Sequence, residues 1–243
     1  MKELRNEIDN ILAESGKDKE VVDSIRKEIS IYPFTTESRI LVYLVASKAI
    51  TYEQFNKLHS DFKKRNKYLD LYDLAPRTFG ETWCEKKILD LFPDFIKASK
   101  KNLSSVYPDF KGEFDLWLDG IRVEVKACRA NSKGNKESIS SRAYLHAEAK
   151  KYSFKYHYQQ LKPSCCDVFI WIGVCRDQLL YWVISSEELK NSDKFVSQHR
   201  NQESDTKKKE IFEGQVFMTE EDLKPYLVTK KQILEVVKLK GKK

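Results

Sequence analysis

Apolar residues in the first third of the chain recur at the spacing of amphipathic helices. The repeat is present at residues 4–12 and 21–29, and it continues through a strongly apolar stretch at residues 37–49. Thr51, followed three residues later by Gln54, forms a capping box that opens a further helix over residues 52–66. We therefore expect residues 1–72 to form a helical arm or subdomain.

The pattern changes after Pro76. A helix is predicted over residues 81–92, and short apolar runs then predict strands at 95–99, 166–175, 178–185 and 213–218. The polar stretch 140–161 is predicted to be helical with some irregular structure. Short helices are predicted after Ser185, a second capping box with Glu188, and over 219–227. Alternating helices and strands indicate a mixed α/β (α+β) domain over residues 73–228, followed by a basic, disordered C-terminal tail at 229–243.

Residues 113–127, EFDLWLDGIRVEVKA, predict a β-hairpin. Asp119-Gly120 favours a two-residue type I′ turn, which requires positive φ at both central residues. In that register each opposed pair has position numbers that sum to 239. One face then holds four apolar residues, namely Phe114, Leu116, Val123 and Val125. The other face holds Glu113, Asp115, Glu124 and Lys126, with Trp117 and Arg122 towards the turn.

The opposed carboxylates Asp115 and Glu124 are the most informative pair. Cross-strand neighbours lie roughly 4.5–5.5 Å apart at Cβ, where like charges are destabilising. A cation between them would relieve the repulsion, and oxygen-only ligands suit Mg²⁺ better than zinc. The Lys126 ammonium lies on the same face, where it would orient a water or stabilise charge on a phosphate oxygen. A plain solvent-facing strand would instead pair Glu113 with Lys126 as an ordinary ion pair.

Composition narrows the class of protein. The chain has 243 residues, of which 41% are hydrophobic and 33% charged, as in a globular protein with a core. Its formal net charge of +7 favours a polyanionic partner. Five cysteines without CxxC spacing indicate free thiols. The charged N-terminus and the lack of a long apolar run predict a cytoplasmic protein with no membrane partner.

An Asp before a hairpin and Glu-Val-Lys on its second strand resemble the PD-(D/E)xK nuclease motif. The predicted order of helix, hairpin, helix and apolar strand, over residues 77–185, is similar to the αβββαβ core of that superfamily. Size and charge are most like a type II restriction endonuclease. The resemblance implies that Asp115 and Glu124 hold Mg²⁺ and that Lys126 assists the water. It also implies an acid from the preceding helix, either Glu85 or Glu81, and a product with a 5′-phosphate.

A literal Pro108-Asp109 lies slightly upstream of the hairpin. It offers Asp109 as an alternative metal-binding acid, but the hairpin register favours Asp115. The segment after the Glu-Val-Lys strand is rich in side chains that bind phosphates and base edges. Our candidates for DNA contact are Arg129, Asn131, Lys133, Asn135, Ser141, Arg142, Gln160 and Lys162. Gln159 and the patch at residues 199–202 are weaker candidates, and His157 is expected to pack locally.

The sequence therefore predicts a Mg²⁺-dependent endonuclease that cuts double-stranded DNA at a specific sequence. Three alternatives remain open: a repair or recombination nuclease of the same fold that reads DNA structure, a DNA-binding module without catalysis, and a basic protein that does not act on nucleic acid. A palindromic target would imply a homodimer. A restriction enzyme would also imply a cognate DNA methyltransferase in the same system.

Overall fold

A computed structural model describes residues 2–15, 22–23, 36–134, 136–198 and 213–242. The chain divides into two compact units, Met1–Lys67 and Tyr68–Lys243. The division falls a few residues before the expected boundary at residue 72, because the short helix η1 (Leu69–Tyr72) contributes Leu71 and Tyr72 to the core of the second unit.

The first unit is helical, as the apolar spacing predicts. It contains α1 (Lys2–Ser15), α3 (Thr36–Ala46) and α4 (Tyr52–Arg65), and Thr51 and Gln54 form the predicted capping box. Ile8, Leu12 and Leu44 are among the buried residues of its core. Of the helix predicted at residues 21–29, only residues 22–23 are among those described.

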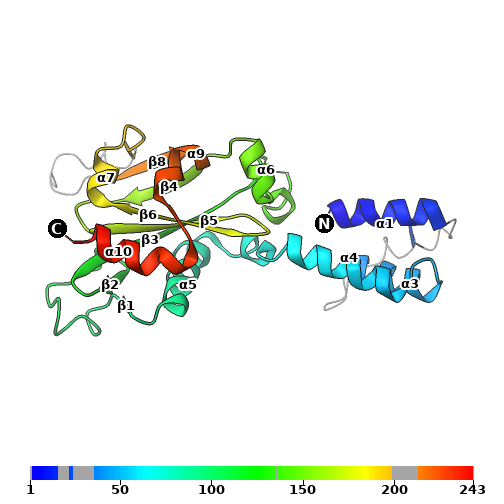
Figure 1. Cartoon of the computed structure of the whole chain (residues 1–243), viewed down its shortest axis with the longest axis horizontal. Coiled ribbons are helices and arrows are strands. Elements are labelled where there is room, and N and C mark those ends of the chain that lie inside the picture. The colour runs from blue at the N-terminus through cyan, green and yellow to red at the C-terminus, as the bar shows by residue number, and fades with distance from the viewer. Residues whose placement is uncertain (1, 16–21, 24–35, 135, 199–212, 243) are drawn as a thin grey trace. The chain divides into compact units, whose positions relative to one another are not determined.

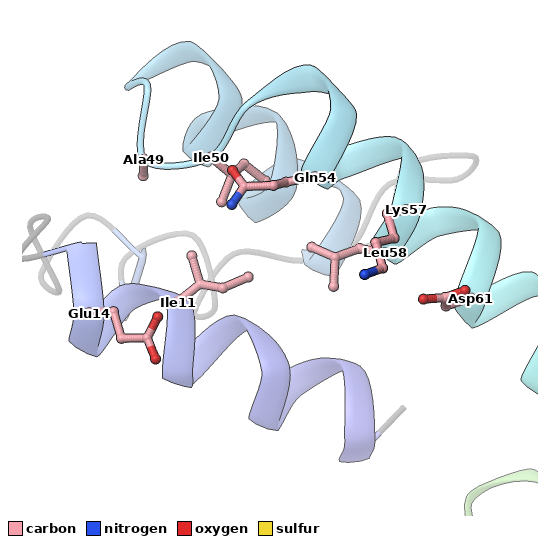
Figure 2. Close-up of a pocket in the computed structure, with 8 residues that line it drawn as sticks. All are labelled: Ile11, Glu14, Ala49, Ile50, Gln54, Lys57, Leu58 and Asp61. Carbon is pink, nitrogen blue, oxygen red and sulfur yellow. The ribbon is translucent and has the colours of Figure 1, made fainter.

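A pocket of about 380 Å³ lies between α1 and α4 in this unit. Ile11 on α1 and Leu58 on α4 extend into the space between the two helices (Figure 2). Glu14 and Lys57 also line it, so the pocket combines an apolar interior with charged groups.

The second unit is built on a six-stranded mixed sheet in the order β1-β2-β3-β5-β6-β9 (Figure 1). Strands β1 to β3 form an antiparallel meander, β5 runs parallel to β3, and β6 and β9 continue antiparallel. A second sheet has the order β4-β8-β7. The strands are β1 (Ile96–Lys97), β2 (Leu116–Leu118), β3 (Ile121–Arg129), β4 (Tyr156–Leu161), β5 (Val168–Val174), β6 (Leu179–Ser185), β7 (Val196–Ser197), β8 (Gly214–Met218) and β9 (Leu227–Val228).

One face of the large sheet is covered by helices. The α-helices α5 (Cys84–Leu91) and α10 (Ile233–Lys240) and the π-helix η2 (Thr78–Trp83) pack there. Their buried side chains meet the alternate residues of β3 and β5 that point to this face, including Val123, Val125 and Ile170. Figure 1 shows α5 and α10 on the side of the sheet away from β4 and β8.

The three-stranded sheet and several short helices cover the opposite face. The short helices are α6 (His146–Lys151), α7 (Ser186–Lys190) and α9 (Glu220–Leu223), with the 3-10 turns η3 (Ser140–Arg142), η4 (Lys224–Tyr226) and η5 (Lys230–Gln232) elsewhere in the unit. Tyr156 and Tyr158 of β4 pack with Trp171 and Trp182 of the large sheet. Because both faces of β5 are buried, its sequence VFIWIGV is apolar throughout.

Two predictions of local structure were wrong. The helix expected over residues 140–161 is replaced after α6 by β4, because Tyr156, Tyr158 and Leu161 face the core. The C-terminal segment 229–243 is not a disordered tail, since α10 buries Ile233 and Val237 completely against the sheet. In the part of the chain that the structure describes, no helix has the length and apolar character needed to span a membrane.

Candidate active site

The hairpin turn forms as its sequence predicts. Asp119 has φ of 47° and Gly120 has φ of 92°, so both central residues take the left-handed conformation. Strand partners are Leu118 with Ile121, Trp117 with Arg122, and Leu116 with Val123, which confirms the predicted register near the turn.

The pairing of β2 with β3 stops after Leu116, whereas β3 continues to Arg129. Asp115 lies at this fork. Its backbone N–H donates to the Val123 carbonyl at 3.1 Å, and its Oδ2 accepts a hydrogen bond of 2.8 Å from the Val125 N–H. The Asp115 carboxylate thus takes the place of a strand partner for Val125.

The predicted pairs beyond Leu116 are therefore not part of the ladder. Phe114 was expected to share a face with Leu116, and this prediction was wrong. It packs instead with Phe110 and Leu103 in the cluster on the opposite face of the sheet. Glu113 does not meet Lys126, because its carboxylate accepts the Lys111 N–H at 2.6 Å. The chain changes direction at Asp115, so the period-two alternation cannot be carried across it.

The fork nevertheless brings the carboxylates of Asp115 and Glu124 together. Burial, reinforced by repulsion from the Glu124 carboxylate, raises the pKa of Asp115 to about 7. The hydrogen bond from Val125 and the nearby Lys126 ammonium act in the opposite direction. The two carboxylates lie close together and the pKa of Asp115 is raised, so a cation bound between them would be stabilised.

Lys126 lies two residues after Glu124 on the same side of β3. Its Nζ is 2.6 Å from Glu124 Oε1, and the two side chains are 23% and 14% exposed. Burial favours the neutral amine, but the charges of Glu124 and Asp115 outweigh it and raise the Lys126 pKa. The side chain is therefore an ammonium at neutral pH.

Glu85 is the acid of the preceding helix that approaches this cluster. It occupies the first turn of α5, its side chain is 13% exposed, and its Oε2 is 3.0 Å from Lys97 Nζ on β1. Its charge contributes to the raised pKa of Asp115. Glu81, the alternative, is 60% exposed and bound to Arg77 at 2.8 Å. The geometry favours Glu85 as the fourth member of the cluster.

The literal Pro108-Asp109 is not part of this cluster. Asp109 is exposed in a turn of the loop between β1 and β2. It is therefore Asp115, and not Asp109, that the fork brings close to Glu124.

A cleft of about 420 Å³ opens beside Lys126. One part of its wall comes from Lys126 and Ala127 of β3 and from Arg77 and Glu81 at the π-helix. The opposite part comes from residues 157–160 of β4. Gln160 of this wall was a predicted DNA contact, but its place on a strand was not predicted, because residues 156–161 were expected to be helical. Alternation of Tyr156 and Tyr158 with polar residues was the available signal.

The last residue of β3 and the loop after it use several of their polar side chains internally. Arg129 donates to the carbonyls of Tyr72 at 3.0 Å and Leu74 at 2.8 Å, and its guanidinium lies 4.0 Å from the centre of the Phe79 ring. Burial lowers its pKa. These contacts give Arg129 a structural role, and we remove it from the candidates for DNA contact.

Other candidates in this loop differ in their contacts. Arg142 donates to the Ser132 carbonyl at 2.7 Å, Ser141 bonds to Ser138, and Asn131 donates to the Ser132 carbonyl at 3.0 Å. Lys133 is exposed. Asn135 and the patch at 199–202 lie outside the described residues.

Gln160 and Lys162 lie on or directly after β4, not at the end of a helix. Gln160 is exposed in the cleft, and Lys162 Nζ is 3.6 Å from Glu213. His157 packs locally, as expected, with its ring stacked on Phe217 at a centroid distance of 3.9 Å.

The donor set at the fork consists of oxygens, which fits a hard divalent cation. Among the described residues no group of three or more His, Cys, Asp or Glu side chains is assembled around a single point. A Mg²⁺ ion does not require one, because it commonly binds through one or two carboxylates and keeps several waters. The raised pKa of Asp115 is the feature that a cation would reverse.

Comparison with known proteins gives no relative: no family model, no curated protein and no solved structure matches this chain.

Proposed function

We propose that this protein is a metal-dependent endonuclease that hydrolyses phosphodiester bonds in double-stranded DNA. The observation that carries the proposal is the fork between β2 and β3. Two carboxylates, Asp115 and Glu124, are forced together there beside a charged, half-buried lysine, Lys126, at the wall of an open cleft. A fold has no need of this arrangement, which costs stability, so a function is the simplest reason for it.

The topology supports the same reading. Helix α5 precedes the antiparallel meander β1-β2-β3, and α6 lies in the crossover to β5, which pairs in parallel with β3. Apart from β4, which lies between α6 and β5, this order of helix, three strands, helix and strand is the one that the resemblance to the αβββαβ core of PD-(D/E)xK nucleases implies. The three acidic and basic positions of the motif fall at the fork of that meander.

Asp115 and Glu124 would hold the Mg²⁺ ion, which when bound supplies Lewis-acid stabilisation of the phosphate and a more acidic water. The other contributions come from the chain. Glu124 holds the Lys126 ammonium at 2.6 Å, so Lys126 is fixed as a donor. With a raised pKa it does not act as a base but orients the water or stabilises charge on the phosphate. Glu85 adds a carboxylate from α5, held in place by Lys97.

Within this class we propose a type II restriction enzyme, on the basis of chain size and the net charge of +7. Its partners would be double-stranded DNA, a second copy of the chain for a palindromic target, and a cognate DNA methyltransferase. These partners are part of the proposal, and the cleavage assay below tests the first of them.

The test is incubation of the purified chain with plasmid and phage DNA in Mg²⁺ and, in parallel, in EDTA. We expect discrete fragments with 5′-phosphate ends in Mg²⁺ and intact DNA in EDTA. Cutting of branched substrates alone would instead indicate a structure-reading nuclease. Binding without cutting would indicate a module that lacks catalysis and would overturn the proposal.

The variant Lys126→Ala sharpens this assay. It removes the donor at the cleft, and we expect it to reduce cutting by at least about 100-fold, in the range of losses seen when a stabilising donor is removed. DNA binding measured in Ca²⁺ should persist. If Lys126→Ala cuts as fast as the wild type, the fork is not the site of the reaction.

A further inference from the structure

Strand β4 carries an irregularity where it faces the cleft. Tyr158 pairs with Val216 and Leu161 pairs with Gly214, so three steps along β4 match two steps along β8. The extra residue is a β-bulge. Gln160 lies in it with φ of 55°, a left-handed conformation that is uncommon for a residue other than glycine, asparagine or aspartate.

The bulge changes which side chains point outwards. In a regular strand Gln159 and Gln160 would lie on opposite faces. Here Tyr156, Tyr158 and Leu161 are buried while both glutamines are exposed in succession. The strand thus presents two neighbouring amide side chains on the wall of the cleft that also contains Lys126.

Contacts on both sides hold this segment in place. The Gln160 backbone N–H donates to Gln198 Oε1 at 2.9 Å. His157 Nε2 lies 2.9 Å from Gln215 Oε1 and 3.0 Å from the Gln159 amide nitrogen. It donates to the first or accepts from the second, according to its tautomer, and does not do both at once. His157 is fixed in turn by its stack on Phe217. The Gln160 backbone is therefore held by Gln198, and the Gln159 side chain lies beside the stacked His157 ring.

A strained conformation that a glycine would adopt more readily, occupied by glutamine, indicates that the side chain is used. A carboxamide offers one donor and one acceptor side by side, which matches N7 and N6 of adenine in the major groove. The charged groups that line the cleft are already paired, Arg77 with Glu81 and Lys126 with Glu124. The glutamines are the groups of the cleft wall that suit a neutral base edge.

We infer that the β4 bulge is a base-reading element, in which Gln160, supported by Gln159, recognises the adenine of an A·T pair close to the scissile phosphate. This inference rests on the proposed function, because it takes duplex DNA as the substrate. The inference goes beyond the carboxylates at the fork, because it names the element that selects the DNA sequence.

The test is selection of bound duplexes from a randomised library by the full chain in Ca²⁺. The informative variant is Gln160→Gly, since glycine retains the left-handed backbone and removes only the side chain. We expect the wild type to select a motif that contains an A·T pair, and Gln160→Gly to lose discrimination at that pair by about 10- to 100-fold. Gln159→Ala should weaken the same position.

Two controls separate this inference from the nuclease proposal. Lys126→Ala should select the same motif as the wild type, because its role is in the chemical step. Cleavage of plasmid DNA in Mg²⁺ is measured on the same preparations. If the wild type cuts and the motif is unchanged in Gln160→Gly, the inference is wrong and the nuclease proposal stands. If the wild type does not cut but Gln160→Gly still loses the A·T pair, only the nuclease proposal fails. A wild type that selects no A·T-containing motif overturns the inference.

Discussion

Strands β3 and β5 run side by side in parallel, yet they differ in composition. Every residue of β5 is buried, whereas in β3 only alternate residues from Ile121 to Val125 are buried and Glu124 and Lys126 take the positions next to Phe169 and Trp171. On the face of the sheet that carries the cluster of Trp171 and Trp182, β5 lies under the second sheet. On β3, Lys126 and Ala127 line an open cleft instead.

In β5 both faces therefore serve packing, whereas one face of β3 carries the charged pair of Glu124 and Lys126. Removing a tryptophan from β5 costs an apolar contact, and removing a charge from β3 leaves an unpaired partner. These two kinds of cost respond differently to mutation, to pH and to metal. The following predictions use those responses to test the contrast.

The largest effect on stability is expected from Trp171→Ala in β5. Trp171 is completely buried and stacks on Tyr158 at a ring-centroid distance of 4.6 Å. Truncation to alanine leaves a cavity, and we expect the free energy of unfolding to fall by about 3–5 kcal/mol. Urea unfolding, followed by far-UV circular dichroism of the backbone, measures this loss of stability. A loss below about 1 kcal/mol would mean that this face of β5 is not the core of the unit.

A pH dependence of about 2 kcal/mol is expected from Asp115 in the metal-free protein. Its pKa is raised to about 7 in the folded state, against about 4 in an unfolded chain. The folded state therefore holds a proton that the unfolded state has released, so stability falls as pH rises from 5 to 8. Asp115→Asn should flatten this slope and be more stable than the wild type at pH 8.

Added Mg²⁺ should oppose the same loss, because it favours the ionised carboxylate. Chemical denaturation at pH 5, 6, 7 and 8, with and without the metal, makes the measurement. A stability that rises with pH over this window in the wild type and in Asp115→Asn alike would contradict the assignment of the slope to Asp115.

The smallest effect is expected when the ion pair of β3 is replaced as a whole. In the double variant Glu124→Gln/Lys126→Met the buried charges are removed together, and we expect stability within about 1 kcal/mol of the wild type or above it. Lys126→Met alone leaves two carboxylates without their cation and should lose about 2–4 kcal/mol. Lys86→Met, which breaks an exposed pair with Asp90, is the matched control and should change stability by less than about 0.5 kcal/mol.

Much of the local structure could be predicted because it depends on neighbouring residues. The Asp119-Gly120 turn and the capping boxes of Thr51 and Ser185 form as their sequences indicate. The members of the candidate site were also identifiable, since Asp115, Glu124 and Lys126 lie within one hairpin. The helix acid came from the resemblance, which left Glu85 and Glu81 open, and the contacts in the structure favour Glu85.

The remaining features depend on contacts distant in sequence. Tyr156 and Tyr158 form a strand because tryptophans of β5 and β6 cover them, although their surroundings have a helical composition. Ile233 and Val237 form a helix on the sheet despite the many lysines around them. The Arg129 guanidinium donates hydrogen bonds to the carbonyls of Tyr72 and Leu74, which are more than fifty residues away in the sequence. No short-range pattern specifies these partners.

In the proposed site the carboxylate at the fork, and not the exposed one of the literal Pro-Asp pair, serves the reaction. Cleavage of plasmid DNA in Mg²⁺ by the wild type, Asp115→Asn and Asp109→Asn, side by side, tests it most directly. We expect Asp115→Asn to fold at least as stably as the wild type and to cut at least about 100-fold more slowly, while Asp109→Asn cuts at the rate of the wild type. Normal cutting by Asp115→Asn together with loss of cutting by Asp109→Asn would contradict it.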